Sequence, residues 1–286
     1  MAPTLNSSAI KPETAPQSGG RRLRGIVAES RAGLPLVTVV TSIFNGLPYV
    51  AGCLESVLQQ DYPNIEHIIM DGGSKDGTID VLRQYDDRIA LWKSEPDKGI
   101  YDAWNKALAE ARGEWICFLG CDDELLPGAV SAYMALAVKH PDAEYLSSQV
   151  RWVHSSGYIN PGHGKPWSWK KFSRAMCVAH PGSMHRRSLF ERLGNYDTSY
   201  RGAADYELLL RARDTLKTAF MPIPTAMMRA GGTSDSSAML AEGTRAVIET
   251  GGRNPLLAQI ELRYLQLKFR LGPLRRAVGK LTARCK

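Results

Sequence analysis

The chain has 286 residues, enough to bury a core as one large domain or two small ones, and its 44% hydrophobic and 23% charged residues are ordinary for a globular protein. The net charge is +7, and residues 256–286 account for the whole excess with eight basic residues and one acid. Because the rest of the chain is balanced, this distribution argues against a broad nucleic-acid-binding surface.

The first 33 residues are rich in Pro, Ser, Gly, Ala and Arg with little periodicity, which predicts a disordered lead over 1–33. They contain no apolar signal core, and no stretch of the chain approaches the apolar length of a membrane span. The five cysteines include no Cys-x-x-Cys pair, so we expect reduced thiols and no zinc site. These features predict a cytoplasmic protein that is neither secreted by that route nor integral to a membrane.

Strand-like and helix-like segments alternate from residue 34 onward. The β-branched run "LPLVTVVTSIF" (34–44) predicts a buried strand, and "LPYVAGCLESVLQQ" (47–60) predicts a helix. Further strands are predicted near 65–73, 89–95 and 114–120, with helices near 78–85 and 99–113. This order predicts an α/β fold with a mostly parallel sheet flanked by helices, whose ligands bind beyond the carboxyl ends of the strands.

Polar groups follow three of the predicted strands where such ligands bind. Asp122 and Asp123 come directly after the fourth strand, Asp71 ends the second, and "TSIFN" (41–45) ends the first. Adjacent carboxylates in one crevice suit a hard divalent cation with oxygen ligands, Mg²⁺ or Mn²⁺. The alternative is that "CDDELLP" only starts the next helix, since acids favour helix N-termini.

Three segments occur together in this order: "DGGSKDGT" (71–78), "SEPDKGIYDAWNKALAEARGEWICFLGCDDE" (94–124) and "GAADYELLLR" (202–211). The combination resembles the family 2 inverting glycosyltransferases of the GT-A fold, and it is most similar to bacterial enzymes that build exopolysaccharides and O-antigens. The resemblance covers roughly residues 36–232. It implies a Rossmann-like catalytic domain over 34–232, with a nucleotide-sugar half at about 34–126 and an acceptor half at about 127–232.

The resemblance implies roles for the acids at the strand ends. Asp123 would bind the metal, and Asp122 would reach the ribose of the nucleotide or assist with the metal. Glu124 could add a ligand or start the next helix. Asp71 would hydrogen-bond the base, although Gly72 stands where the commoner "DDGS" form of the motif has a second acid.

The turn after the first strand is expected to line the nucleoside pocket. Thr41, Ser42 and Asn45 match the corresponding positions of the family. For Asn45 an equally good interpretation is a simple turn residue, because Asn-Gly is a common chain breaker.

The segment "EPDKGIYDAWNKA" is expected to contact the donor phosphates and nucleotide. Lys98 and the flexible Gly99 precede a helix, and a lysine with backbone N–H groups at a helix N-terminus favours phosphate. Asp102 and Asn105 lie three apart on that helix and are predicted to face the nucleotide, with Trp104 in the core.

Asp205 is the predicted catalytic base, since the family places its base in an acid pair before a helix like "YELLLR". Here Ala204 occupies the preceding position, so only Asp205 matches. The alternative role for Asp205 is capping the helix N-terminus, and Glu207 is a weaker second candidate for the base.

Residues 144–185 are predicted to form a hairpin and the acceptor region. Aromatic faces stack on sugar rings, and several Trp and His residues gather in this stretch. Trp152 and His180 are the predicted acceptor contacts, although a purely structural role is an equal alternative for His180.

The residues and the resemblance together imply an inverting, metal-dependent hexosyltransferase that moves a sugar from a nucleotide-diphosphate sugar to a hydroxyl of a glycan or polyprenyl-linked acceptor in bacterial cell-surface polysaccharide synthesis. A nucleotidyltransferase is one alternative, but the turn after the first strand lacks the Gly-rich basic loop of that class. An inactive nucleotide-sugar-binding partner protein is a second alternative, which Gly72 and Ala204 leave open. A nucleic-acid binder is disfavoured by the acidic crevice.

Residues 233–286 are predicted to form a helical basic tail. Apolar residues recur in steps of four and three and draw one stripe: Ile260, Tyr264, Leu267, Leu271, Leu274, Val278 and Leu281. A basic amphipathic segment of this kind suits an anionic membrane surface, here the inner face of the plasma membrane. The alternatives are packing on the catalytic domain or pairing of two chains in a homodimer, and Gly272-Pro273 predicts two short helices.

Overall fold

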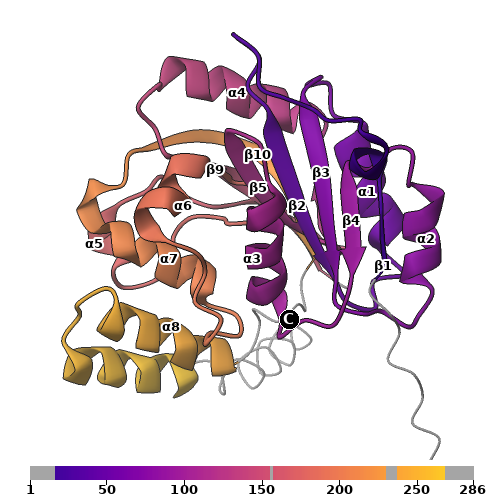
Figure 1. Ribbon diagram of the computed structural model, residues 1–286. Helices are drawn as coiled ribbons and strands as arrows, with labels where there is room; N and C mark the ends of the chain where they lie inside the picture. Colours follow the sequence, from indigo (N-terminus) through magenta and orange to yellow (C-terminus); the bar gives the residue numbers. More distant parts are fainter. Residues whose placement is uncertain (1–16, 155–156, 230–236, 268–286) are drawn as a thin grey trace, which may run out of the picture.

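The computed structural model describes residues 17–154, 157–229 and 237–267. Its strands form one sheet in the order β1-β4-β3-β2-β5-β9-β7-β10-β6, with β8 paired to β7 (Figure 1). The strands are β1 Gln17–Gly19, β2 Val37–Ile43, β3 Ile65–Asp71, β4 Leu91–Ser94, β5 Trp115–Gly120, β6 Glu124–Leu125, β7 Tyr145–Val153, β8 Ile159–His163, β9 Met184–Arg186 and β10 Thr218–Arg229. The helices are α1 Val50–Leu58, α2 Thr78–Gln84, α3 Ile100–Glu110, α4 Ala129–Lys139, α5 Trp169–Phe172, α6 Arg187–Leu193, α7 Ala204–Ala212 and α8 Ser237–Glu249.

The first half of the sheet is the predicted parallel core. β2 pairs in parallel with both β3 and β5, and β4 pairs in parallel with β3. In this register Ile43 lies opposite Asp71, and Asp71 lies opposite Ser94. The carboxyl ends of these strands therefore meet at one edge of the sheet, as the alternation of strands and helices predicts.

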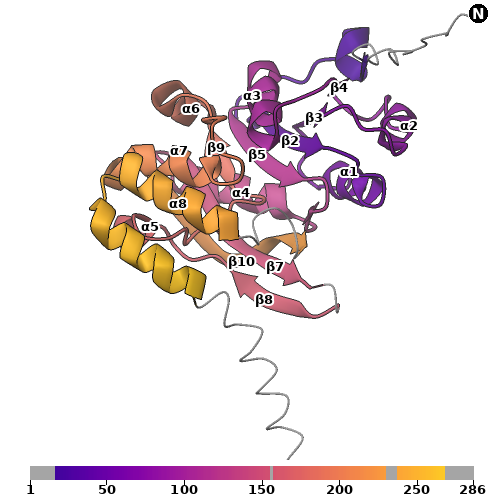
Figure 2. The same cartoon turned by 90° about the horizontal axis from the view of Figure 1, so that it is seen from below.

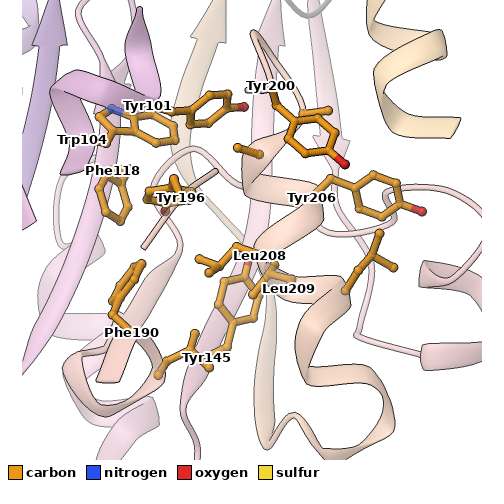
Figure 3. Close-up of a cluster of buried hydrophobic side chains, with 14 of the residues drawn as sticks. Tyr101, Trp104, Phe118, Tyr145, Phe190, Tyr196, Tyr200, Tyr206, Leu208 and Leu209 are labelled. Atoms are coloured by element: carbon orange, nitrogen blue, oxygen red, sulfur yellow. The ribbon is translucent and has the colours of Figure 1, made fainter. Parts of the chain in front are cut away.

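Helices cover both faces of this parallel core because its strands are apolar on both sides. Ile116 and Phe118 of β5 pack in one cluster with Trp104 of α3 and with α6 and α7. Cys117 and Leu119 of the same strand pack in the other cluster, with α1 and α4. Figure 3 shows the first cluster, where Tyr101 and Trp104 lie beside Phe118 and Tyr196.

The second half of the chain extends the sheet with strands of mixed direction. β9 is antiparallel to both β5 and β7, whereas β10 is parallel to β7. β7 and β8 form the predicted hairpin within residues 144–185. The prediction of a mixed, mostly parallel sheet flanked by helices is therefore confirmed.

The prediction of a disordered lead over 1–33 is wrong from Gln17 onward, and residues 1–16 lie outside the described residues. β1 adds an antiparallel strand to β4 at the sheet edge, and a short 3-10 helix, Arg21–Arg24, follows it. Arg22 pairs with the fully buried Glu66 of β3. Composition could not reveal this order, because it comes from ion pairs and a strand partner that are distant in the sequence.

Removing the Arg22 side chain is expected to destabilise the protein by about 3 kcal/mol, because Arg22→Ala leaves the Glu66 carboxylate buried without its cation. Thr38 donates its hydroxyl to the same carboxylate and limits the loss. Arg24→Ala is the matched control: its side chain is 42% exposed where it pairs with Asp86, so we expect less than about 1 kcal/mol. Urea unfolding of the two variants measures the difference, and equal small losses would contradict the packed N-terminal segment.

The C-terminal helices lie against α7. α8 and a helix over residues 255–267 run alongside it (Figure 2). Ala258 and Leu262 are the buried contacts of the last helix, whereas Ile260, Tyr264 and Leu267 of the predicted stripe are exposed. Residues 233–236 and 268–286 of the predicted tail lie outside the described residues. No helix in the described part of the chain combines the length and apolar content needed to cross a bilayer.

Candidate functional site

A cleft of about 370 Å³ opens at the carboxyl ends of β2 and β5. Its walls come from six separate parts of the chain: the turn after β2, the first turns of α3, the end of β5 with the residues after it, the loop before β9, the start of α7, and the end of β10. Among the residues that line it are Phe44, Asn45, Tyr49, Tyr101, Trp104, Asp122, Asp123, His180, Asp205 and Arg229. The cleft therefore gathers the predicted metal ligands and the predicted base into one space.

The two acids after β5 face the same point of the cleft. A Cβ placed on Gly120 would lie 3.0 Å from Oδ1 of Asp122 and 3.0 Å from Oδ2 of Asp123, so a glycine here leaves room for both carboxylates. Asp123 is only 6% exposed. Its burial, together with the charge of Asp122, raises the pKa of Asp123 to about 7. Two acids held this way are stabilised by a nearby positive charge.

Arg229, at the end of β10, is the cation that the protein itself brings to these acids. Its backbone N–H donates to Oδ1 of Asp123 (3.2 Å), and its Nε donates to the backbone carbonyl of Asp122 (3.1 Å). Its Nη2 pairs with Glu124 Oε1 at 3.2 Å. Glu124 belongs to β6, which pairs with β10, so the predicted helix-start role for Glu124 is wrong and sheet pairing fixes its position.

The acid pair fits a divalent cation. Within the described ranges no three Asp, Glu, His or Cys residues form a metal cluster, so protein ligands would come from Asp122 and Asp123 alone. Mg²⁺ characteristically binds through one or two carboxylates and takes its remaining ligands from waters and substrate phosphates. Such an ion would offset the repulsion between the two converging carboxylates and would lower the raised pKa of Asp123.

Asp205 lies in the first turn of α7 and faces the cleft. The capping position before the helix is held by Ala203, and no side chain caps it, so the structure does not use Asp205 as the N-cap. The Tyr101 hydroxyl donates to Asp205 Oδ1 at 3.0 Å. Burial and the Asp205 carboxylate raise the pKa of Tyr101 well above its usual value, which keeps this phenol protonated as a donor. Glu207 instead points into the protein, where it pairs with Arg211.

The two predicted acceptor residues lie in different places. His180 lines the cleft and stacks on Trp104 with ring centroids 5.2 Å apart. Its burial lowers the pKa of His180, so the ring is neutral near pH 7. Trp152 does not line the cleft; it lies on β7 and contacts the His163 ring at 5.2 Å. Its link to the cleft is Met228, its β10 partner, which does line it.

The side chain of Asp71 hydrogen-bonds the loop that follows it. Its carboxylate accepts hydrogen bonds from the backbone N–H groups of Gly73 and Ser74 at 3.0 and 2.9 Å and from the Ser94 hydroxyl at 2.7 Å. It is 2% exposed. A Cβ on Gly72 would lie 2.6 Å from Oδ2 of Asp97, so the carboxylate of Asp97 occupies the space that a side chain at position 72 would need.

Of the three predicted residues at the end of β2, only Asn45 lines the cleft. Asn45 lines the cleft in a left-handed conformation (φ 51°), and its side-chain oxygen accepts the Lys75 N–H at 3.0 Å. Ser42 accepts a hydrogen bond from Trp104 Nε1 at 3.1 Å, directly beneath the cleft wall. Thr41 is fully buried and contacts His67 at 2.9 Å, so its side chain does not reach the cleft.

The face of α3 that meets the cleft is the aromatic one. Tyr101 and Trp104 line it. Asp102 faces Lys106 at 3.5 Å, and Asn105 exchanges hydrogen bonds with the backbone of Tyr196, so neither of these two predicted residues is brought to the cleft. Gly99 begins the helix at φ 120°, a conformation that favours glycine. Lys98 beside it is exposed, and its carbonyl accepts from Arg201.

Comparison with known proteins assigns the family and the fold. The model of glycosyl transferase family 2 matches residues 38–194, which are more than half of the chain and include β3, β4, β5 and all but the first residue of β2. This protein belongs to glycosyl transferase family 2. It is therefore a glycosyltransferase, and the GT-A fold implied by the resemblance is confirmed by the solved structures below.

Several bacterial glycosyltransferases are similar to this family member in sequence. An uncharacterized glycosyltransferase of Mycobacterium tuberculosis is 37% identical over 183 residues, which cover 62% of this chain and 69% of the relative. A PGL/p-HBAD biosynthesis glycosyltransferase of the same species is 28% identical over 199 residues, 67% of this chain and 76% of the relative. TuaG of Bacillus subtilis, named provisionally for teichuronic acid biosynthesis, is 43% identical over 93 residues, 32% of this chain and 37% of the relative.

Solved glycosyltransferase structures share the fold. A fragment of S. aureus TarS, solved with UDP-GlcNAc, has a TM-score of 0.61 at 15% identity over 83% of this chain and 73% of its own. A longer TarS chain is matched over only 43% of its length. The mannosyltransferase PcManGT from Pyrobaculum calidifontis, solved with GDP-Man and Mn²⁺, has a TM-score of 0.57 at 20% identity over 83% of this chain and 72% of its own.

Four cleft residues of this family 2 glycosyltransferase were not identified by the sequence analysis. Phe44 and Tyr49 are 66% and 44% exposed and offer aromatic faces at the cleft mouth. Tyr101 and Arg229 contact the predicted base and the acid pair. The exposed aromatic of "TSIFN" was the one available signal, because the other three depend on contacts between distant segments.

Proposed function

We propose that this glycosyltransferase inverts the anomeric centre of a nucleotide-diphosphate sugar in a metal-dependent transfer to a hydroxyl of a glycan or lipid-linked acceptor. The observation that carries the proposal is that one cleft holds both the acid pair Asp122–Asp123 and the separate carboxylate Asp205. Inversion in a single displacement needs a leaving-group site and a base, and the cleft supplies both functions from different strands and helices.

In this mechanism Asp205 accepts the proton of the acceptor hydroxyl as its oxygen bonds to the anomeric carbon. The bond from that carbon to the diphosphate oxygen breaks, and nucleoside diphosphate leaves. Tyr101 holds Oδ1 of Asp205, while Oδ2 makes no hydrogen bond to the described residues and is free to take the proton. His180 forms the cleft wall near Asp205, where we assign it to the acceptor sugar.

The donor side rests on Asp122, Asp123 and the residues around Gly72. When bound to the acid pair, Mg²⁺ or Mn²⁺ would neutralise charge on the diphosphate leaving group. Phe44 and Asp97 flank Gly72, and we assign to them the stacking and hydrogen bonding of the nucleotide base in place of Asp71, whose oxygens hold the loop.

The names of the relatives support a cell-surface role. TuaG is named for teichuronic acid biosynthesis, and a second relative for PGL/p-HBAD biosynthesis. We propose that the acceptor here belongs to bacterial cell-surface polysaccharide or glycolipid synthesis.

A screen of nucleotide-sugars by thermal shift with Mn²⁺ tests the proposed function. A donor at one hundred times its dissociation constant stabilises the folded protein by about 2.7 kcal/mol. Release of nucleoside diphosphate identifies a glycosyltransferase, whereas release of pyrophosphate identifies a nucleotidyltransferase. Donor binding with no release under any acceptor condition would favour the inactive binding protein.

We propose that the C-terminal tail brings the enzyme to the inner face of the plasma membrane. The exposed stripe of Ile260, Tyr264 and Leu267 supports this, since these residues are 56%, 65% and 56% exposed while the opposite side of the helix packs on the domain. A chain ending after Leu271 lacks five of the eight basic residues of the tail, each contributing about 1 kcal/mol at an anionic surface.

The truncated protein is expected to fold, to bind donor, and to lose sedimentation with anionic liposomes that the full chain shows at low salt. Liposomes of neutral lipid and a high-salt arm are the controls, because only an electrostatic contribution depends on both. If the full chain does not sediment with anionic liposomes, the membrane proposal is rejected. The exposed stripe would then pair two chains in a homodimer, which analytical ultracentrifugation detects.

A further inference from the structure

An apolar cavity of about 270 Å³ lies between the start of α7, α8 and the helix over residues 255–267. Figure 2 shows these three helices side by side. The walls include Tyr206 of α7, Leu240 and Val247 of α8, and Leu262 of the last helix. The volume is close to the lower end, about 300 Å³, of sites that bind small molecules.

This cavity meets the catalytic cleft at Asp205. Two residues, Gly202 and Asp205, line both spaces. A Cβ on Gly202 would collide with the Met239 side chain, so the glycine lets α8 approach the start of α7 at the junction. Asp205 thus lies between the cleft that holds the acid pair and an apolar cavity.

The charged groups at the cavity are arranged at its margin. Arg253, 15% exposed, is paired with Glu261, which is 46% exposed. Arg174 is exposed on the other side. Arg253, the more buried of these groups, has its counter-ion. The pair therefore leaves no unpaired buried charge in the wall, and apolar groups are favoured inside the cavity.

Gly243 leaves one wall of the cavity open. It sits in the interior of α8, where a glycine is about 1 kcal/mol less favourable than alanine. A Cβ at this position would make ordinary contact with Tyr206, at 3.8 Å, so the fold does not demand glycine. A longer side chain here would project into the cavity.

We propose that this space, the acceptor cavity, binds the alkyl portion of a glycolipid acceptor while the acceptor hydroxyl meets Asp205. The inference rests on the proposed function, because it gives Asp205 the role of base. The donor lies at the acid pair and the acceptor sugar lies in the cleft near His180 and Asp205, so the alkyl portion of the acceptor extends past Asp205 to the side where the walls are apolar. The cavity thereby sets the acceptor class.

Binding of n-decyl β-D-glucopyranoside, below its micelle concentration, is compared with binding of methyl β-D-glucopyranoside by calorimetry on the full chain. We expect the decyl compound to bind at least about tenfold more tightly, since burying a few methylene groups suffices for this factor. Gly243→Leu fills the cavity and should abolish the advantage. Leu265→Gln, at a wall position that is 41% exposed and tolerant of a polar group, should reduce it severalfold.

Ala241→Leu is the matched control, since it makes a similar change on an exposed position of the same helix and should keep the tenfold advantage. Equal binding of the two glucosides by the wild type, or an advantage unchanged in both cavity variants, would overturn the acceptor cavity. Mn²⁺-dependent donor binding is measured on the same samples. Donor binding without an alkyl preference rejects the cavity alone, whereas alkyl binding in the cavity without any donor binding rejects the proposed function alone.

Discussion

Replacing Asp205 by asparagine is expected to lower the rate of sugar transfer by about 10²-fold or more while donor binding stays within twofold. The substitution is nearly isosteric, and an asparagine oxygen can still accept the hydrogen bond from Tyr101. What is lost is the ability to take a proton from the acceptor hydroxyl. Single-turnover transfer and equilibrium donor binding, measured on the same protein, separate these two effects.

Asp214→Asn is the matched control for this experiment. Asp214 is an exposed acid just after the same helix, outside the residues that line the cleft, so the same change of charge should leave transfer near the wild-type rate. A wild-type rate in Asp205→Asn would remove Asp205 from the mechanism. His180 would then be tested next, because Glu207 is held in its ion pair with Arg211.

The Asp123→Ala variant is expected to bind donor in Mn²⁺ no better than the wild type does in EDTA. The reason is that Asp123 and Asp122 are the two protein carboxylates available to the ion, and removing the more buried one leaves a single, half-buried ligand. Transfer should fall by at least about 10²-fold with it, since metal stabilisation of the leaving group amounts to several kcal/mol. Titration of donor with and without Mn²⁺ gives the comparison directly.

Glu124→Gln provides the control for the acid pair. Glu124 follows Asp123 in the chain but is engaged by Arg229 at the β6–β10 pairing and does not line the cleft. Its variant should retain the Mn²⁺ dependence of donor binding. Donor affinity that is the same in EDTA, in Mn²⁺ and in Asp123→Ala would show that Arg229, and not a metal ion, neutralises the donor phosphates.

The parallel core and the acid pair follow from local sequence. Runs such as "LPLVTVVTSIF" are apolar on both sides of a strand and alternate with amphipathic segments, and this pattern is specific for a sheet covered on both faces. Parallel strands bring their carboxyl ends to one edge, so Asp122 and Asp123 could be placed in a crevice without knowledge of any long-range contact.

The tertiary structure decided which side chains face that crevice. The helix α3 carries a polar pair, Asp102 and Asn105, and an aromatic pair, Tyr101 and Trp104, and sequence spacing alone favours neither for the cleft. Asn105 hydrogen-bonds the backbone of Tyr196, 91 positions later in the chain, and so does not reach the cleft. Tyr101 lines the cleft and hydrogen-bonds Asp205, 104 positions later.

The same holds for the N-terminal segment, for the cation beside the acids and for the acceptor cavity. Gln17–Gly19 joins the sheet only because β4 is its edge, and Arg229 reaches the acids only because β10 pairs with β6. The cavity needs three helices from separate parts of the chain. Local sequence determines which elements form and where their polar ends lie, but strand order and helix packing determine which distant side chains meet, since those contacts depend on the whole arrangement of the core.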